Sequence, residues 1–421
     1  MKRILYILCA VICLFACDNE EQEMGNRTVI VYMAGENNLT LSSGYRFLGA
    51  DLDEIIEGSK KLGSNQRLLV FVDSLNTYSK QAGNPFIMEV HGGKTEILHQ
   101  YDEEFYSSDP ARFREVLQWI MTNAPADSYG LVLWGHACGW AVSTDTIAGA
   151  RSVTRAYGQD NGSDGNGNGI KWMNITQMAR ALEGLPKLEF IFADCCNMMC
   201  AEIGYELRNA TNYLIGSPAE IPGDGAPYDL IIPCLYKSDR ELYRGIIDTY
   251  YNYYLGDFQE DYDLSGFSLP MSVIDTKYIE QLAQATHDVL DKFNGGYPVY
   301  PKSPNADSLV MYWYLDSPIM YDMRALIRRN TSDADFAQWE QKFKQAVPYY
   351  RMSMRWMTIY SELEYYEFPK FDPDASKNGC VSMFFPREQY WYYNGTFRYN
   401  STYNNFGWNR VIDWSRYGWS Y

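Results

Sequence analysis

Short apolar runs that alternate with helical segments restrict the fold of this sequence more than any other feature. Five runs rich in β-branched and aromatic residues have the length of buried strands: 28–33, 67–73, 130–134, 188–193 and 213–216. Helical patterns lie between several of them, at 52–62, 110–123 and 174–182. Asp109 and Pro110 supply a capping residue and a first-turn proline for the second helix. Apolar strands separated by helices indicate a mainly parallel sheet covered on both faces, so we predict an α/β fold.

The texture of the chain changes after about residue 265, where Tyr, Trp and Phe become dense. We therefore predict one α/β domain over residues 27–264 and an aromatic-rich C-terminal subdomain over residues 265–421 that packs on it. The alternative role for these aromatic rings is an exposed face that stacks on sugars.

The N-terminus has the pattern of an export signal. Two basic residues precede an apolar stretch over residues 4–16, which is too short to span a bilayer as a permanent helix. The stretch ends at Cys17 in a pattern that resembles a bacterial lipobox. We expect a lipoprotein signal peptide over residues 1–16, lipid on Cys17, and an acidic tether over residues 17–26 that resembles the export signal of surface lipoproteins. The expected location is the bacterial outer membrane, at the cell surface; a plain secretory signal is the alternative.

The net charge and the spacing of the cysteines argue against binding to nucleic acid, a disulfide framework and a zinc site. The sequence has 36 Lys and Arg against 53 Asp and Glu, a net charge of −17, which argues against binding to nucleic acid. The clustering of Cys195, Cys196 and Cys200 is a poor framework for disulfides. No CxxC pair recurs at zinc spacing, so we predict no metal-ligating set.

Residues 160–169 consist of Asp, Asn, Gly and Ser, all of which favour turns. Their oxygen content resembles a calcium-binding loop, but the Glu that closes an EF-hand loop is missing. We favour an exposed flexible loop, with a metal site as the alternative.

Two predicted strands end in groups that could serve as a nucleophile and a base. His136 follows the strand at 130–134, and Cys195 and Cys196 follow the strand at 188–193. Because neighbouring parallel strands place their carboxyl ends at one edge, His136 and a cysteine would lie close together. A thiol needs a nearby base to become a nucleophilic thiolate. The alternative is that these residues only pack. The other histidines are predicted to be bystanders: His91, His99 and His287.

Five motifs in order resemble those of the clostripain family of cysteine endopeptidases, which groups with caspases, gingipains, legumain and separase. They lie at 31–39, 125–140, 194–198, 216–228 and 379–386. The resemblance implies a caspase-like three-layer sandwich for the domain at 27–264. It also implies cleavage of peptides or proteins after exposed Arg or Lys, with no required cofactor; some members need calcium.

The resemblance assigns roles residue by residue. His136 matches the catalytic histidine, and Cys196, two residues after Asp194, matches the nucleophile. The N–H groups of Ala137 and Cys196 are the expected oxyanion donors, although glycine commonly stands where this chain has Ala137. Asp194 matches an acid of the specificity pocket, and Asp224 is a second pocket candidate by position.

Many family members are zymogens that cut themselves between the histidine and cysteine motifs. Arg151 and Arg155 lie in that stretch and are the candidate self-cleavage sites. Cys195 and Cys200 are expected to be small buried residues. The competing hypothesis is a weak or inactive surface lipoprotein that binds glycan or protein through its aromatic C-terminal part.

Overall fold

The computed structural model describes a large part of the chain: residues 26–41, 44, 46–75, 83–140, 157–162, 169–262, 266–292, 310–313, 320–357, 377–385 and 406–414. The predicted signal peptide, Cys17, Arg151 and Arg155 lie outside these residues. Within the described ranges, no helix combines the length and apolarity needed to cross a membrane.

A single large sheet forms the centre of the described structure, with the strand order β13-β10-β9-β8-β5-β1-β2-β3-β4. The five predicted strands are its parallel middle: β1 (Arg27–Gly35), β2 (Gln66–Ser74), β5 (Ser128–Gly135), β8 (Leu188–Asp194) and β9 (Thr211–Gly216). Antiparallel strands extend both edges: β3 (Phe86–His91), β4 (Lys94–Gln100), β10 (Met271–Asp275) and β13 (Tyr349–Arg351).

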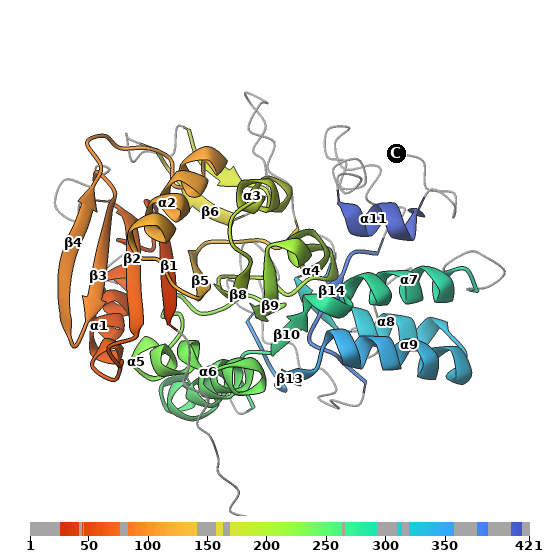
Figure 1. Ribbon diagram of the computed structural model, residues 1–421. Coiled ribbons are helices and arrows are strands. Elements are labelled where there is room, and N and C mark those ends of the chain that lie inside the picture. The colour runs from red at the N-terminus through yellow and green to blue at the C-terminus, as the bar shows by residue number, and fades with distance from the viewer. Residues whose placement is uncertain are drawn as a thin grey trace, which may run out of the picture.

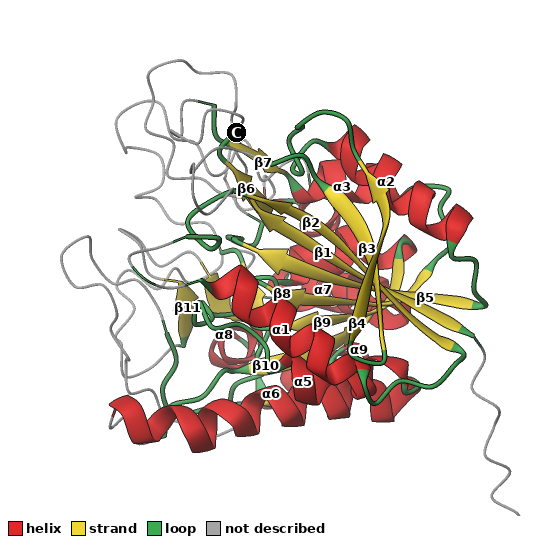
Figure 2. Cartoon of the chain, turned by 90° about the vertical axis from the view of Figure 1, so that its left-hand side faces the viewer, coloured by secondary structure: helices red, strands yellow, loops and turns green. Residues whose placement is uncertain are grey.

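Alternation along the strands creates a separate hydrophobic core on each face of the sheet. In β1, Ile30 and Tyr32 belong to one core, whereas Val29 and Val31 belong to the other. The first face is covered by α2 (Pro110–Asn123), α3 (Ile175–Leu182), α4 (Ala201–Glu206) and α7 (Ile279–Leu290). The second is covered by α1 (Phe47–Ser59), α5 (Tyr228–Ile231) and α6 (Asp239–Tyr262). Figures 1 and 2 show these layers, and the predicted three-layer sandwich is confirmed.

Capping residues explain why the start of α2 could be predicted from the sequence and the start of α1 could not. The side chain of Asp109 accepts hydrogen bonds from the N–H groups of Ala111 and Arg112, so α2 begins where its capping signal predicts. Helix α1 begins at Phe47 instead of residue 52. Arg46 precedes it without a side-chain capping bond, so no residue of capping type marks this start.

The C-terminal part contributes to the same sheet and to the first core. Strand β10 pairs with β9, while α8 (Met323–Asn330), α9 (Asp333–Ala346) and α11 (Gly407–Ile412) lie on the side of α7 (Figure 1). Four tryptophans of this part are fully buried: Trp339, Trp356, Trp408 and Trp414. No described aromatic side chain is among the large exposed apolar residues. Most of the described rings of this part therefore pack in the core, whereas the aromatic-rich stretches 386–405 and 415–421 lie outside the described residues.

Two small sheets flank the large one. Strand β6 (Tyr157–Asp160) pairs with β7 (Lys171–Met173). The other small sheet contains β11 (Met311–Trp313), β12 (Met320–Asp322) and β14 (Ser382–Met383). Because β6 ends at Asp160, the prediction of irregular structure throughout residues 160–169 is wrong at its first residue, whose side chain is buried.

Candidate active site

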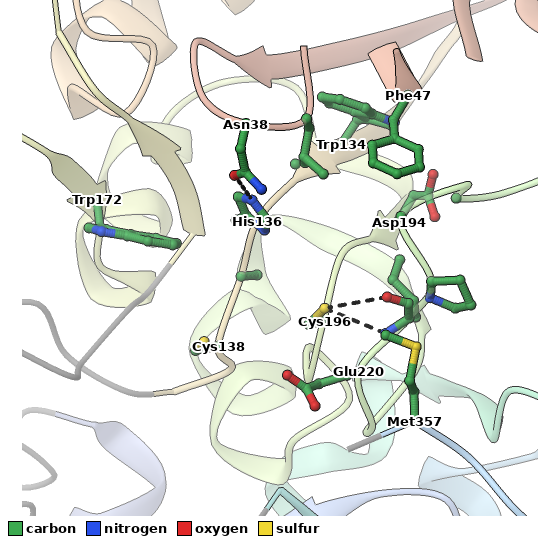
Figure 3. Close-up of a pocket in the computed structure, with 17 residues that line it drawn as sticks. Asn38, Phe47, Trp134, His136, Cys138, Trp172, Asp194, Cys196, Glu220 and Met357 are labelled. Atoms are coloured by element: carbon green, nitrogen blue, oxygen red, sulfur yellow. Dashed lines mark hydrogen bonds between the residues drawn. The ribbon is translucent and has the colours of Figure 1, made fainter. Parts of the chain in front are cut away.

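The register of two neighbouring strands brings His136 and Cys196 to the same edge of the sheet. Strands β5 and β8 run parallel, with Trp134 paired to Asp194. His136 and Cys196 each follow two residues later, beyond the carboxyl ends of these strands. Both line a cavity of about 330 Å³, which Figure 3 shows in close-up. Asn38, Ala137 and Asp194 also line it.

The backbone after β8 aims the two adjacent cysteines in different directions. Cys195 is 1% exposed and packs in the first core, whereas Cys196 lines the cavity. The next residue, Asn197, has a φ of 60°, a left-handed conformation that asparagine tolerates better than most residues. Its N–H donates to the Ala219 carbonyl at 2.9 Å, and its Nδ2 donates to the Pro218 carbonyl at 3.0 Å. These bonds hold the turn that presents Cys196.

The thiol of Cys196 lies against the backbone of Ile221, whose N–H is 3.5 Å from Sγ. Burial raises the pKa of this thiol, the nearby Glu220 carboxylate raises it further, and the Ile221 N–H acts in the opposite direction. The thiol is therefore protonated near neutral pH in this arrangement. Formation of a thiolate requires a base or a change in local charge. His136, which lines the same cavity, is the candidate base.

Asn38 is a partner of His136 that the sequence reasoning missed. Its Oδ1 lies 2.7 Å from Nε2 of His136. An amide oxygen only accepts hydrogen bonds, so this contact favours the tautomer with the proton on Nε2. The carbonyl of His136 accepts from the N–H of Gly158 at 2.8 Å, which anchors the backbone of the same residue. Asn38 lies within the recognised motif at 31–39, but the motif did not reveal its role.

Asp194 places a buried carboxylate at the cavity. Its Oδ1 accepts from the Tyr250 hydroxyl at 2.7 Å, and its Oδ2 accepts from the Tyr228 hydroxyl at 2.8 Å and the Ala226 N–H at 3.2 Å. Burial raises the pKa of Asp194, and these three bonds oppose that rise. Asp224, the other predicted pocket acid, is exposed and is not among the described residues that line the cavity.

A second buried carboxyl group, that of Asp51, lies near Asp194 and was not predicted from the sequence. A Cβ added at Gly225 would lie 3.0 Å from Oδ2 of Asp51 and 3.1 Å from Oδ2 of Asp194, so glycine permits close approach to both carboxylates. Asp51 accepts a hydrogen bond from the indole of Trp134. Burial, and then the negative charge of Asp194, raises the pKa of Asp51 to about 9. Asp51 and Asp194 are therefore two buried carboxyl groups that do not both carry a negative charge easily near neutral pH.

The backbone around Ala137 is compatible with an alanine side chain. Positive φ angles occur at Gly135 and Gly139, with values of 138° and 62°, but Ala137 is not among the described residues with positive φ. Within the described structure, neither the Ala137 N–H nor the Cys196 N–H donates a hydrogen bond to another backbone group.

A thiol and an imidazole at the carboxyl edge of this three-layer sandwich define the class of cysteine proteases with a caspase-like fold. The model of the clostripain family matches residues 31–416, so the chain belongs to the clostripain family. It is a cysteine protease of that family.

Solved structures agree with this assignment. The chain is 28% identical to a secreted C11 cysteine protease from Bacteroides thetaiotaomicron in complex with an irreversible peptide inhibitor; the TM-score is 0.74, and the match covers 93% of this chain and 99% of the other. An inactive zymogen C11 protease from Parabacteroides distasonis shares the fold at 24% identity, with a TM-score of 0.72 and coverage of 92% and 98%. A comparison with curated proteins gives no match.

Proposed function

We propose that the protein is an endopeptidase that cleaves after Arg or Lys, with Cys196 as the nucleophile and His136 as the proton carrier. The observation that carries this proposal is the buried Asp194 carboxylate in the same cavity as the Cys196 thiol. No Lys or Arg is among the described residues lining the cavity. A cationic substrate side chain would therefore meet an uncompensated carboxylate and form a charge-assisted hydrogen bond.

The chemistry follows the order expected for an acyl-enzyme. Sγ of Cys196 attacks the carbonyl carbon after Arg or Lys, and its proton passes to His136. The imidazolium then protonates the leaving amine, which breaks the peptide bond and leaves a thioester. Water attacks the thioester while His136 takes its proton, and the thiol is regenerated with release of the acid.

The oxyanion formed in both steps needs donors near Cys196. The N–H groups of Ala137 and Cys196 are suitable because neither is used by a backbone hydrogen bond within the described structure. The positive φ angles that favour glycine occur at Gly135 and Gly139, and Ala137 between them is not among the described residues with a positive φ. An alanine at this position is therefore compatible with the role of its N–H as an oxyanion donor.

Asp51 strengthens the preference for a cation. The carboxyl groups of Asp51 and Asp194 both lie close to Gly225. Two neighbouring carboxyl groups do not both ionise easily without a positive partner. A bound Arg or Lys side chain supplies that charge, so cation binding favours ionisation of Asp51 beside Asp194. The related protease from Bacteroides thetaiotaomicron forms a complex with an irreversible peptide inhibitor, which supports peptides as the class of substrate.

Export, lipid attachment at Cys17, and self-cleavage after Arg151 or Arg155 belong to the same proposal. The secreted relative supports export. Mass spectrometry of an active preparation tests self-cleavage, because a chain that is intact between residues 140 and 190 would contradict it.

Hydrolysis of fluorogenic peptides with Arg, Lys, Leu or Asp before the cleaved bond tests the activity. We expect turnover of the Arg or Lys peptides only. It should fall at least about 10³-fold in Cys196→Ala, as expected for loss of a nucleophile, and persist in the adjacent control Cys195→Ala. Loss of turnover in Cys195→Ala alone would overturn the assignment of the nucleophile.

A further inference from the structure

Glu220 brings a carboxyl group to the catalytic cavity, beside the proposed nucleophile. It lines the same cavity as Cys196 and is only 9% exposed. The carbonyl of Ala219 accepts a hydrogen bond from the N–H of Asn197 at 2.9 Å. On the other side of Glu220, the N–H of Ile221 lies 3.5 Å from Sγ of Cys196. Both neighbours of Glu220 therefore contact the turn that carries the thiol, which fixes the position of Glu220 relative to Cys196.

The carboxyl group of Glu220 lies on the opposite side of the thiol from Asp194. Figure 3 shows the Cys196 thiol between these two acidic side chains. An isolated antiparallel bridge joins Glu220 to Met357, so the C-terminal part of the chain contributes to this side of the cavity. Asp194 and Glu220 are the two acidic residues among the described residues that line the cavity. The nucleophile therefore has one acidic group on each side.

The charge of Glu220 acts on the thiol itself. Burial is the largest cause that raises the pKa of Cys196, and the negative charge of Glu220 is the next. A positive charge placed beside Glu220 would offset this influence and favour the thiolate. The same positive charge would form a charge-assisted hydrogen bond with the carboxylate. A cationic group at this position would therefore improve both the binding of the substrate and the ionisation of the nucleophile.

A peptide that binds with a cationic side chain at Asp194 directs its next residue toward Glu220. The side chain before the cleaved bond lies at Asp194, and the carbonyl carbon of the same residue must meet Sγ of Cys196. One residue of extended chain covers about 3.3–3.6 Å, so the residue after the bond lies just beyond the thiol. Glu220 is the acidic residue on that side of the cavity.

We propose that Glu220 selects Lys or Arg in the residue that follows the cleaved bond, so that the preferred substrates contain two adjacent basic residues. This preference rests on the proposed function, because the position of the peptide is set by a cationic side chain at Asp194. An acidic residue after the bond is disfavoured, since it would place a second negative charge beside Glu220. A neutral residue lacks both the attraction and the repulsion.

Internally quenched peptides test the preference, because they retain the residue after the cleaved bond. Each peptide carries Arg before the bond and Lys, Gln or Glu after it, and mass spectrometry identifies the bond that is cut. We expect kcat/KM for the Lys peptide to exceed that for the Gln peptide at least about tenfold, within the range for a hydrogen bond to a charged group. The Glu peptide should be cut most slowly. Equal values for the three peptides in the wild type would overturn the selection and leave cleavage after Arg in place.

Glu220→Gln removes the charge and preserves the shape of the side chain. The ratio of kcat/KM between the Lys and Gln peptides should fall to about one in this variant, because the charge-assisted bond is lost. Glu183→Gln removes an exposed carboxylate that does not line the cavity, so it is the matched control and should keep the wild-type ratio. A wild-type ratio in Glu220→Gln would overturn the assignment to Glu220. The comparison of peptides in the wild type does not depend on the folding of either variant.

Alkylation of Cys196 provides a readout that needs no turnover. At a fixed pH, iodoacetamide should modify Cys196 faster in Glu220→Gln than in the wild type, because loss of the negative charge increases the thiolate fraction. Mass spectrometry of the peptide that contains Cys196 measures this rate, and Glu183→Gln should leave it unchanged. An equal rate in Glu220→Gln and the wild type would contradict the action of Glu220 on the thiol. Absence of turnover for every Arg and Lys peptide would instead overturn the proposed function, and with it this preference.

Discussion

Oδ1 of Asn38 lies 2.7 Å from Nε2 of His136, although 98 residues separate them in the sequence. Asn38 follows β1 and His136 follows β5, and these strands are paired neighbours in the parallel sheet. The contact places a fixed acceptor on the imidazole and thereby selects its orientation and tautomer. It also joins the carboxyl end of β5 to the turn that follows β1.

Replacement of Asn38 should therefore impair catalysis more than binding. In Asn38→Ala we expect kcat for an Arg peptide to fall about tenfold, within the range for loss of one orienting hydrogen bond, with little change in KM. Asn38→Asp should restore much of the rate and shift the acidic limb of the pH–rate profile upward, because a carboxylate stabilises the imidazolium. An unchanged kcat in Asn38→Ala would show that His136 is positioned without this contact.

Asp194→Asn should change substrate preference. The amide preserves shape but removes the charge that faces the cation, so kcat/KM for Arg and Lys peptides should fall at least about 100-fold, or about 2.7 kcal/mol. Asp224→Asn is the control; because Asp224 does not line the cavity, a change below about threefold is expected. The reverse pattern in these two variants would identify Asp224 as the residue that binds the cation.

Asp51 should make the free protein less stable as pH rises. Its pKa is raised from 3.8 to about 9 in the folded state, so between these values the folded protein binds more protons than the unfolded chain. The free energy of unfolding then decreases with rising pH, by at most about 1.4 kcal/mol per pH unit for one group. Tm measured from pH 5 to 9 should fall less steeply in Asp51→Asn than in the wild type; parallel curves would contradict the assignment.

Gly225→Ala tests the close approach of the two carboxylates. Gly225 has a φ of 62°, and its new Cβ would stand 3.0 Å from Asp51 and 3.1 Å from Asp194. Gly92→Ala is a matched control, because its φ is 59° and nothing lies within 4 Å of its Cβ. Both should lose about 1 kcal/mol of stability from backbone strain. Only Gly225→Ala should also lower kcat/KM for Arg peptides; equal kinetics would show that the carboxylates can move away.

Much of the architecture could be predicted because its signals are local. Strands such as 188–193 are apolar throughout, and the capping pair Asp109 and Pro110 marks the start of α2. The five motifs and their order along the chain likewise indicated the family. The start of α1 could not be predicted, since Arg46 carries no capping signal and burial against the second core sets the boundary.

The sequence by itself determined the five central strands, their parallel arrangement and the chemical types at the ends of β5 and β8, because each depends on periodicity or on neighbours along the chain. Only the tertiary structure decided which partners those groups meet. The contact of Asn38 with His136 and the approach of Asp51 to Asp194 both arise from strand register and crossover connections. Such contacts join residues far apart in the sequence, and neither composition nor local spacing records the distances between them.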